Sequence, residues 1–245
     1  MNEKVYYATS DNRTLCGIIN RVNISKEIVV ICHARSSNKD SRVTSSVANT
    51  LSNYNHNNFR FDFIGCGESD GDINDYNVTN MINNLNDTLR WLSDEYGYSE
   101  FILFGCSMGA RIISLVDRKK YDIKKLILWY GALNYGRGLF NVPGKEEKIA
   151  KAQGFYTFEN GVKLPYEYYL DEKKYCAYKE LINWIDVPKL FVHGSGDQFV
   201  PYKHSVKISK KCKHSTLVLI GDGDHGFKND RHLKKAIKET IRFLD

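Results

Sequence analysis

The sequence predicts an α/β fold in which helices cover both faces of a mostly parallel central sheet and a small cap is inserted between two strands. Short apolar segments alternate with helical segments along most of the chain, which is the pattern of a parallel sheet with crossover helices. Residues 134–183 interrupt the alternation and indicate the insertion. A serine between two glycines, Ser107, follows one of the buried strands. Sites in such sheets lie at the carboxyl ends of the strands, so this serine marks the expected site.

The composition is that of a soluble globular protein. The chain has 245 residues, of which 42% are hydrophobic and 26% are charged, values ordinary for one α/β unit. We divide it into a first core segment, residues 1–133, a cap, residues 134–183, and a second core segment, residues 184–245. No apolar run reaches about 18 residues, so no membrane span is expected. The first residues carry no apolar signal core, so we expect no export by a signal peptide.

Cysteine usage and charge exclude several other classes. The six cysteines form no C-x-x-C pair, which is typical of reduced thiols in the cytoplasm rather than of disulfides or zinc ligands. The histidines show no metal-ligand spacing, and we expect neither a metal nor an organic cofactor. The formal charge of +6 is spread through short lysine groups without aromatic or motif context, so no nucleic-acid partner is expected. No feature of the sequence assigns an oligomeric state.

The first half of the chain alternates between strand and helix patterns after an opening hairpin, whose turn contains Asp11 and Asn12. Alternating or β-branched apolar runs predict the strands, and a period near 3.6 predicts the helices. The predicted elements are strands at residues 5–9, 15–20, 28–32 and 59–63 and helices at residues 41–54 and 81–97.

The second half continues the alternation on both sides of the insertion. Within the insertion, Asn160 and Gly161 separate two strand-like runs and predict a hairpin between residues 155–158 and 162–164. The remaining predicted elements are strands at residues 101–104, 126–130, 189–193 and 216–220 and helices at residues 110–116, 202–209 and 233–244.

The segment around Ser107 has the order G-x-S-x-G, with glycines at Gly105 and Gly109. It lies between a buried strand and a helix, which is the context that a nucleophile elbow requires. A sharp strand-to-helix turn brings neighbouring backbone very close, so side chains at the two glycine positions would collide. The helix that follows also directs its N-terminal amides toward the site where negative charge develops during acyl transfer. We therefore predict Ser107 as a nucleophile.

A serine nucleophile needs a base and an acid, each expected in a loop directly after a later strand. Asp197 follows the strand at residues 189–193, and His225 follows the strand at residues 216–220. The order Ser107, Asp197, His225 is the one expected of this architecture. The sequence predicts these three residues as catalytic.

Other interpretations of the same acidic residues stay open. Asp197 alternatively caps the helix at residues 202–209, a common role for aspartate. Asp222 and Asp224 are alternative partners of His225, although both lie on the loop of the histidine itself. Cys106 lies one position from the apex of the turn and is interpreted as a buried thiol.

Acyl transfer also requires two backbone N–H groups that bind the oxyanion. One is expected from Met108, the residue after the nucleophile. The second is expected from the loop after the strand at residues 28–32, with Arg35 as the first choice and Ala34 as the alternative. His33 is interpreted as a residue that holds this loop by hydrogen bonds.

With these motifs the sequence resembles the α/β-hydrolase family, and within it the small feruloyl (cinnamoyl) esterases and the serine-aminopeptidase-like hydrolases. The matching stretches cover nearly the whole chain and lie at residues 33–35, 38–39, 62–69, 105–109, 193–201 and 224–227. The resemblance implies an α/β-hydrolase fold, a triad of Ser107, Asp197 and His225, an oxyanion hole from Arg35 and Met108, and ester hydrolysis through an acyl-enzyme.

The chain departs from that family at one position. Such esterases usually carry His-Gly-Phe where this chain has His33, Ala34 and Arg35. The guanidinium either favours a substrate with a carboxylate or phosphate, or turns to solvent. We take Ala34, Phe199 and Tyr169 as the substrate-contact candidates. Tyr169 belongs to the tyrosine-rich part of the insertion, which suits an aromatic or acyl pocket but equally a packed hairpin.

The sequence thus predicts a serine hydrolase that cleaves a carboxylic ester of a small acyl or aryl substrate, without a cofactor. An acyl thioesterase with the same triad is the alternative activity. The alternative from another class is a ligand-binding module on a hydrolase scaffold. The expected partner is a small-molecule ester or thioester.

Overall fold

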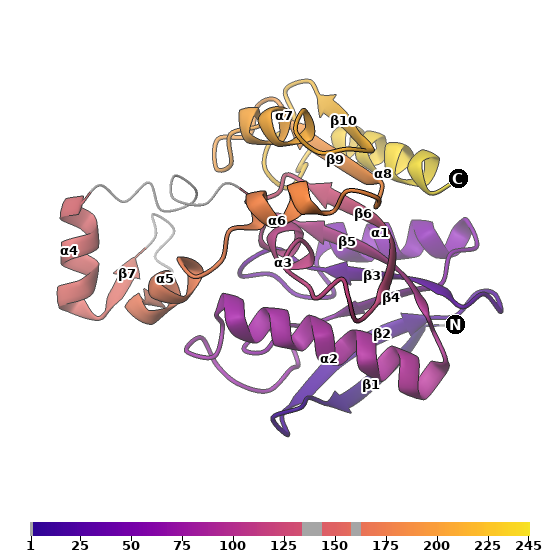
Figure 1. The fold of residues 1–245 in the computed structure, drawn as a ribbon, viewed down its shortest axis with the longest axis horizontal. Coiled ribbons are helices and arrows are strands. Elements are labelled where there is room, and N and C mark those ends of the chain that lie inside the picture. Colours follow the sequence, from indigo (N-terminus) through magenta and orange to yellow (C-terminus); the bar gives the residue numbers. More distant parts are fainter. Residues whose placement is uncertain (1, 134–143, 158–162) are drawn as a thin grey trace.

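A twisted sheet crosses the protein (Figure 1). The computed structural model describes residues 2–133, 144–157 and 163–245. Within these residues the main sheet has eight strands in the order β1-β2-β4-β3-β5-β6-β9-β10. β2 pairs antiparallel with β1 and with β4, and the other neighbours pair in parallel. The strands are β1 (Asn2–Ala8), β2 (Thr14–Asn20), β3 (Glu27–Cys32), β4 (Asn58–Phe61), β5 (Glu100–Cys106), β6 (Asp122–Trp129), β9 (Lys189–Gly194) and β10 (Ser215–Ile220).

Helices cover both faces of this sheet, which confirms the predicted fold class. α1 and α8 pack on one face, and α2, α3 and α7 pack on the other. Side-chain caps set the helix starts, since Ser41 accepts from Thr44 N–H and Asn77 accepts from Asn80 N–H. Gly97 ends α2 in the left-handed conformation. The helices are α1 (Arg42–Asn53), α2 (Val78–Tyr96), α3 (Met108–Ile113), α7 (Lys203–Ser209) and α8 (Asp230–Leu244).

The segment between β6 and β9 forms further elements, of which α4 and β7 stand away from the sheet while α6 lies against it (Figure 1). β7 and β8 pair antiparallel, as the sequence predicted. The Asn160-Gly161 turn itself lies outside the described residues. The elements are α4 (Gly144–Gln153), β7 (Phe155–Thr157), β8 (Lys163–Pro165), α5 (Tyr166–Glu172) and α6 (Ala177–Asn183).

Two buried acidic side chains at the end of α5 anchor the inserted segment to the core. Glu172 forms an ion pair of 2.5 Å with Arg111 of α3. Asp171 accepts from the backbone N–H of Thr79 at 2.8 Å, in the first turn of α2, where a carboxylate is favoured by the free amides and the helix dipole. The insertion is therefore fastened to the helix that follows Ser107.

The helix after Ser107 is shorter than predicted. The sequence pattern extended it to residue 116, whereas α3 ends at Ile113. Ser114 donates its hydroxyl to the carbonyl of Ala110 at 2.7 Å, and Leu115 N–H bonds to the carbonyl of Ile112 at 2.9 Å. These bonds tighten the chain into turns, because serine bonded back to the preceding turn favours a bend.

The start of α3 touches the end of β3 through backbone alone. A Cβ added at Gly109 would lie 2.2 Å from the carbonyl oxygen of Cys32. A Cβ added at Gly105 would lie 2.4 Å from the backbone of Gly109. Ser107, between them, has a φ of 52°, a conformation that costs a non-glycine residue energy. Only glycine at positions 105 and 109 permits this turn.

We expect Gly109→Ala to lower the free energy of unfolding by about 3 kcal/mol, because the methyl group meets backbone that cannot yield. Urea unfolding of the purified variant measures this. Gly221→Ala is the matched control, since a Cβ there would meet nothing within 4 Å. Equal stabilities of the two variants would contradict the close approach.

Candidate active site

Three side chains from separate loops form one chain of hydrogen bonds. Nε2 of His225 lies 3.1 Å from Oγ of Ser107, and Nδ1 of His225 lies 2.7 Å from Oδ2 of Asp197. Ser107 and Asp197 are buried, and His225 is partly exposed. The imidazole is thus in reach of both the hydroxyl and a buried carboxylate, the geometry in which a base can take a serine proton.

The three residues meet because each follows the carboxyl end of a strand at one edge of the sheet. Ser107 follows β5, Asp197 lies in the loop after β9, and His225 lies in the loop after β10. A Cβ at Gly194 would lie 2.0 Å from the carbonyl oxygen of Gly223, so a glycine lets the last two loops touch. Backbone bonds then tie these loops together and bring the histidine over the acid.

Asp197 is fully engaged by hydrogen bonds. Its Oδ1 accepts from the backbone N–H groups of Phe199 and Val200 at 2.9 and 2.8 Å. Its Oδ2 accepts from His225 and, at 3.1 Å, from Nε2 of His193. Burial acts to raise the pKa of Asp197, but the bonds from His193 and His225 outweigh it and hold this pKa well below its usual range. The group stays ionised at neutral pH.

The alternative roles of the acidic residues can be compared with this geometry. α7 begins after Tyr202 without a side-chain cap, so Asp197 does not cap that helix. Oδ1 of Asp224 accepts from the backbone N–H of Lys228 at 2.9 Å, within its own turn. Asp197 is the carboxylate that bonds to Nδ1 of His225.

Aromatic side chains surround the imidazole of His225. Tyr130 packs edge-on against it with ring centroids 4.8 Å apart. Phe199 lies 5.6 Å away, centroid to centroid, and is 64% exposed, so it stands at the solvent side of the ring. Sequence reasoning did not single out Tyr130. Its position after β6, the strand beside β5, was the available signal.

The loop after β3 packs against the start of α3. Met108 is the first residue of α3, where backbone N–H groups have no partner within the helix. His33 is buried, and its Nδ1 lies 2.7 Å from the carbonyl of Ala34 while its Nε2 accepts from Phe63 N–H at 3.1 Å. Burial lowers the pKa of His33. This agrees with its interpretation as a residue that holds the loop bearing Ala34 and Arg35.

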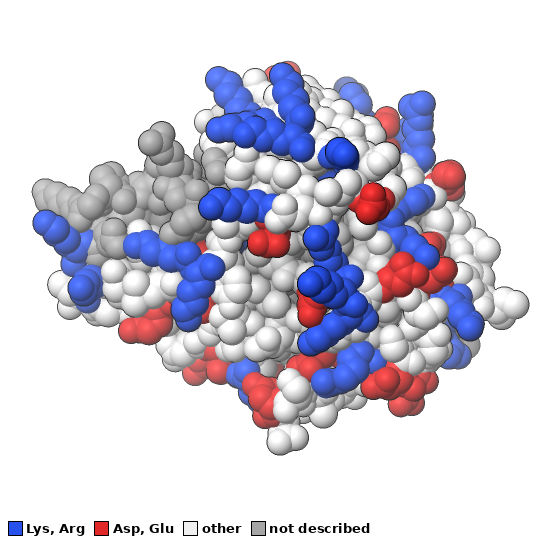
Figure 2. Space-filling view, viewed as in Figure 1, with Lys and Arg blue, Asp and Glu red and all other residues white. Residues whose placement is uncertain are grey.

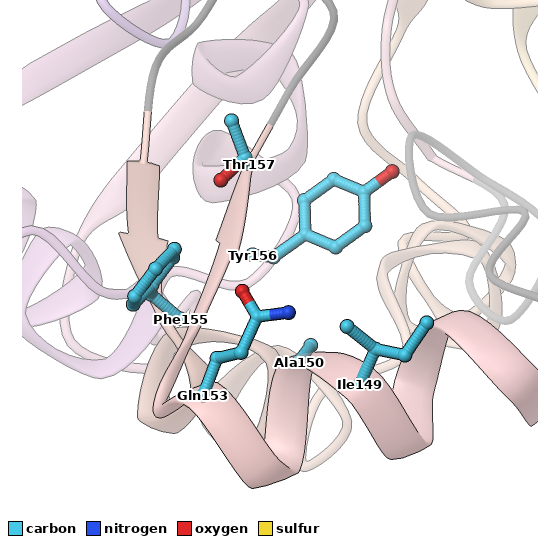
Figure 3. A pocket seen from close by; sticks show the side chains of 6 residues that line it. All are labelled: Ile149, Ala150, Gln153, Phe155, Tyr156 and Thr157. Carbon is cyan, nitrogen blue, oxygen red and sulfur yellow. The ribbon is translucent and has the colours of Figure 1, made fainter.

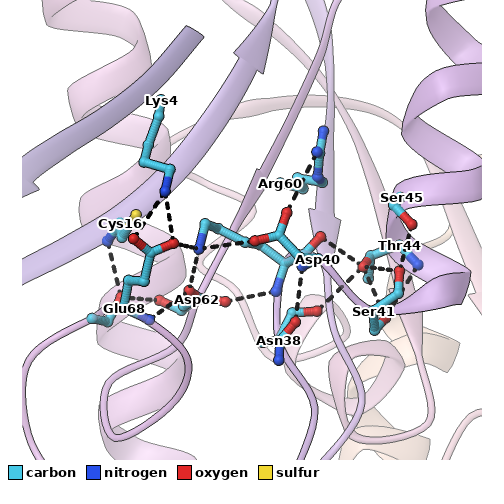
Figure 4. A network of polar contacts seen from close by, with 12 residues as sticks. Lys4, Cys16, Asn38, Asp40, Ser41, Thr44, Ser45, Arg60, Asp62 and Glu68 are labelled. Atoms are coloured by element: carbon cyan, nitrogen blue, oxygen red, sulfur yellow. Dashed lines mark hydrogen bonds and ion pairs between the residues drawn. The ribbon is translucent and has the colours of Figure 1, made fainter. Parts of the chain in front are cut away.

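A polar network that contains Asp62 and Glu68 holds the far end of the same loop (Figure 4), and the buried side chain of Lys39 joins these two carboxylates. Nζ of Lys39 lies 2.9 Å from Asp62 and 2.7 Å from Glu68, and Asp62 also accepts from the backbone N–H of Lys39. Glu68 binds Lys4 of β1 as well. A Cβ at Gly67 would lie 2.1 Å from Asp62, so glycine is required beside the carboxylate. The network joins the loop after β3 to the loop after β4.

The charges of this network stabilise one another. Burial acts to lower the pKa of Lys39, but the bonds to Glu68 and Asp62 outweigh it and raise this pKa. The bond from Lys39, followed by that from Lys4, lowers the pKa of Glu68 to about 2. Lys39 and Glu68 are therefore charged at neutral pH, and the ion pairs of Lys39 are what make a buried lysine tolerable.

The side chain of Arg35 is partly buried, and its charge acts on two buried tyrosines, Tyr76 and Tyr168. Its Nη1 atom is buried. The rings of Tyr76 and Tyr168 stack in parallel with centroids 6.1 Å apart. Burial raises the pKa of both phenols, and the charge of Arg35 acts in the opposite direction on each.

The inserted segment reaches the nucleophile turn through Tyr168, whose hydroxyl lies 4.0 Å from Sδ of Met108. Tyr168 belongs to the tyrosine-rich part of the insertion. The candidate Tyr169, one residue later, packs against the ring of Tyr166 and below the Nζ of Lys173. Ala34 lies half-buried in the loop after β3.

A separate pocket of about 200 Å³ lies on the inserted segment, between α4 and β7 (Figure 3). Its described lining residues do not include Ser107, Asp197 or His225. Its lining residues are Ile149, Ala150, Gln153, Phe155, Tyr156 and Thr157.

All six cysteines are free thiols. Burial raises the pKa of Cys106 to about 11, so this neighbour of Ser107 is not a thiolate at neutral pH.

Among the described residues, no group of three or more His, Cys, Asp and Glu side chains is placed to hold a metal ion. Across the same residues, no helix combines the length and the apolar character needed to cross a bilayer.

Basic side chains gather in several separate groups on the face seen in Figure 2, with acidic residues among them. One group lies over α7, which contributes Lys203 and Lys207. Lys124 of β6 is paired with Asp122, and Lys174, two residues after α5, is paired with Asp171.

Comparison with known families gives two matches. The model of the family described as serine aminopeptidase, S33 matches residues 23–158, which is more than half of the chain. A model described as alpha/beta hydrolase fold matches residues 150–228.

Individual proteins show the same likeness. The Escherichia coli K12 protein YfhR is 26% identical over 221 residues, which cover 89% of this chain and 70% of YfhR. The mitochondrial palmitoyl-protein thioesterase ABHD10 of Mus musculus is 25% identical over 192 residues, covering 73% of this chain and 62% of ABHD10. The structure of Est1E from Butyrivibrio proteoclasticus with bound ferulic acid has a TM-score of 0.82 at 21% identity and covers 98% of this chain and 97% of Est1E. Mouse ABHD10 has the same TM-score at 19% identity, with coverages of 99% and 98%. At these identities the two structures show the fold.

We expect Lys39→Met to lower the free energy of unfolding by about 3 to 5 kcal/mol, because it leaves the buried carboxylate of Asp62 without its counter-ion. Lys4→Met is the matched control, since Lys4 binds the same network from an exposed position. Urea unfolding at pH 7 compares them. A Lys39 variant as stable as the Lys4 variant would contradict the structural role of the buried pair.

Proposed function

The chain belongs to the serine aminopeptidase S33 family of α/β-hydrolases, and from this membership we propose that it hydrolyses a carboxylic ester of a small acyl or aryl substrate through an acyl-enzyme. The observation that carries the proposal is the continuous hydrogen-bond path from Ser107 Oγ through His225 to Asp197. A binding module has no need of this arrangement. No organic cofactor or metal takes part in the proposed reaction.

In the proposed mechanism, Ser107 attacks the ester carbonyl while Nε2 of His225 takes the hydroxyl proton. Asp197 stabilises the imidazolium that forms. The backbone N–H groups of Met108 and Arg35 bind the oxyanion of the tetrahedral intermediate. The bond between the carbonyl carbon and the alkoxide oxygen then breaks, and His225 gives its proton to the departing alkoxide. The acyl group stays on Oγ of Ser107. Water, activated by the same imidazole, releases the acid and restores the hydroxyl.

We assign the substrate contacts on the same basis. Phe199 stands over the imidazole, Ala34 lies in the loop that presents Arg35, and Tyr169 lies on α5 of the inserted segment. We propose residues 134–183 as a cap that forms one wall of the acyl site, which the contact between Tyr168 and Met108 supports. Free thiols at all six cysteines favour a reducing compartment, the cytoplasm.

An acyl thioesterase is the second candidate activity. Its support is the sequence similarity to ABHD10, which is named as a palmitoyl-protein thioesterase. The likeness in fold to Est1E, whose structure holds ferulic acid, favours aryl esters instead. Both reactions use the same serine, base and acid, so the leaving group distinguishes them.

A fluorophosphonate probe should label the protein on Ser107, because only an activated serine displaces its fluoride. Ser107→Ala should abolish the labelling, as read by intact-mass spectrometry. Ser114→Ala is the control, since the buried hydroxyl of Ser114 donates to the carbonyl of Ala110 in α3 and takes no part in the triad. Absence of labelling in the native protein would refute the enzyme and favour the binding module.

Turnover of p-nitrophenyl and feruloyl esters should exceed that of acyl-CoA thioesters of matched chain length by at least about tenfold in kcat/KM, if the site is built for esters. With either class, His225→Ala should lower kcat by about 10⁴-fold or more, because the serine then lacks its base. Steady-state assays over a chain-length series measure both. Preference for thioesters would replace the first activity by the second.

A further inference from the structure

One buried titratable side chain beside the triad has no part in the mechanism above. His193 lies on β9, directly before its last residue, and is completely buried. Its ring lies between the loop that carries Asp197 and helix α7. From the sequence this residue had no predicted role of its own, beyond the end of a predicted strand and the start of the matching stretch 193–201.

The contacts of His193 determine how its ring is oriented. Nε2 lies 3.1 Å from Oδ2 of Asp197 and 3.0 Å from the carbonyl oxygen of Val200. Because a carbonyl oxygen only accepts, Nε2 must carry a proton and donate to this pair of oxygens. Nδ1 lies 2.7 Å from Oγ of Ser205 in α7. Both ring nitrogens are therefore held, and the ring cannot rotate without losing a bond.

The same oxygen of Asp197 accepts hydrogen bonds from two imidazoles, that of His225 and that of His193. Oδ2 accepts from both His225 and His193, while Oδ1 accepts from two backbone N–H groups. Four donors occupy the carboxylate, so it has one orientation. His193 supplies the side-chain donor that is independent of the reacting histidine.

The same ring closes the turn that carries Phe199. Val200 gives its N–H to Oδ1 of Asp197 and receives the proton of His193 on its carbonyl. Val200 is thus held through both its N–H and its carbonyl, which closes the turn of residues 197–200. Phe199, within this turn, lies against His225.

We propose that His193 is a positioning residue, which, held by Ser205, fixes Asp197 and residues 197–200 in the orientation that supports His225. This inference rests on the proposed hydrolase function. His193 itself touches no reacting atom. It acts through Asp197, and its loss should leave substrate binding largely intact while turnover falls.

Removal of the His193 donor has two consequences of known sign. The carboxylate gains freedom to rotate, which lowers the fraction of molecules with a correctly placed imidazole. Oδ2 of Asp197 also no longer accepts a hydrogen bond from His193, so the negative charge on this oxygen favours the imidazolium of His225 more strongly. The acidic limb of kcat/KM should then move to higher pH. Two other titratable groups lie near His225 and His193. The ring of Tyr130 packs against His225, and His204 of α7 interacts electrostatically with His193.

The test compares four variants of the full chain. His193→Leu should lower kcat roughly 10- to 100-fold with little change in KM and move the acidic limb to higher pH. His193→Gln, whose amide can donate to Asp197 and accept from Ser205, should recover most of kcat. Ser205→Ala should show a smaller loss in the same direction. Ser209→Ala is the control, since Ser209 is another buried serine of α7 and its hydroxyl donates to the carbonyl of Val206 within the helix.

A second measurement does not need turnover. In the Ser107→Ala background, proton NMR should show the hydrogen-bonded Nδ1 proton of His225 far downfield, and His193→Leu should broaden or shift it. If Ser107→Ala does not abolish labelling by the probe, the proposed hydrolase function is wrong. The resonance of His225 requires no turnover, so its response to His193→Leu tests the positioning role separately. Should His193→Leu keep kcat within about twofold of the native value, or leave the His225 resonance unchanged, the positioning role is wrong. If His193→Leu does not fold, His193→Gln and Ser205→Ala give the same comparison.

Discussion

The close approach of backbone at the carboxyl edge of the sheet is the constraint on which the candidate site depends. Gly109 lets the start of α3 touch the end of β3, and Gly194 lets the loops after β9 and β10 touch each other. Side chains at these positions would separate the loops by more than a hydrogen bond allows. The hydrogen-bond path from Ser107 to Asp197 therefore requires glycine at positions 109 and 194 as well as the three side chains that form it.

Buried charges then hold the loops at their places. Lys39 joins Asp62, and Arg111 joins Glu172, each pair largely removed from water. Such pairs contribute little net stability compared with apolar residues, but each is costly to break and has one good geometry. The first pair lies between the loops after β3 and β4, and the second ties the inserted segment to α3. Both act on segments that border Ser107.

The fold was largely predictable because its signals are local. Period and β-branching gave every strand of the main sheet, and the serine between glycines indicated the turn after β5. The end of α3 was not predictable, since Leu115 and Val116 continue a helical pattern while the bonds of Ser114 and Leu115 bend the chain. Apolar spacing reports which face is buried, not where competing hydrogen bonds stop a helix.

The sequence by itself determined the order of the elements and predicted that Ser107, Asp197 and His225 lie together, because each lies directly after a strand and parallel strands end at a common edge. Only the tertiary structure decided what surrounds them. His193 and Asp197 are near in sequence, yet the ring meets the carboxylate only because α7 and the turn at Val200 hold it there. Tyr130 and Tyr168 reach the site from distant segments. The direction of a side chain depends on what packs around it, and a linear pattern does not contain that information.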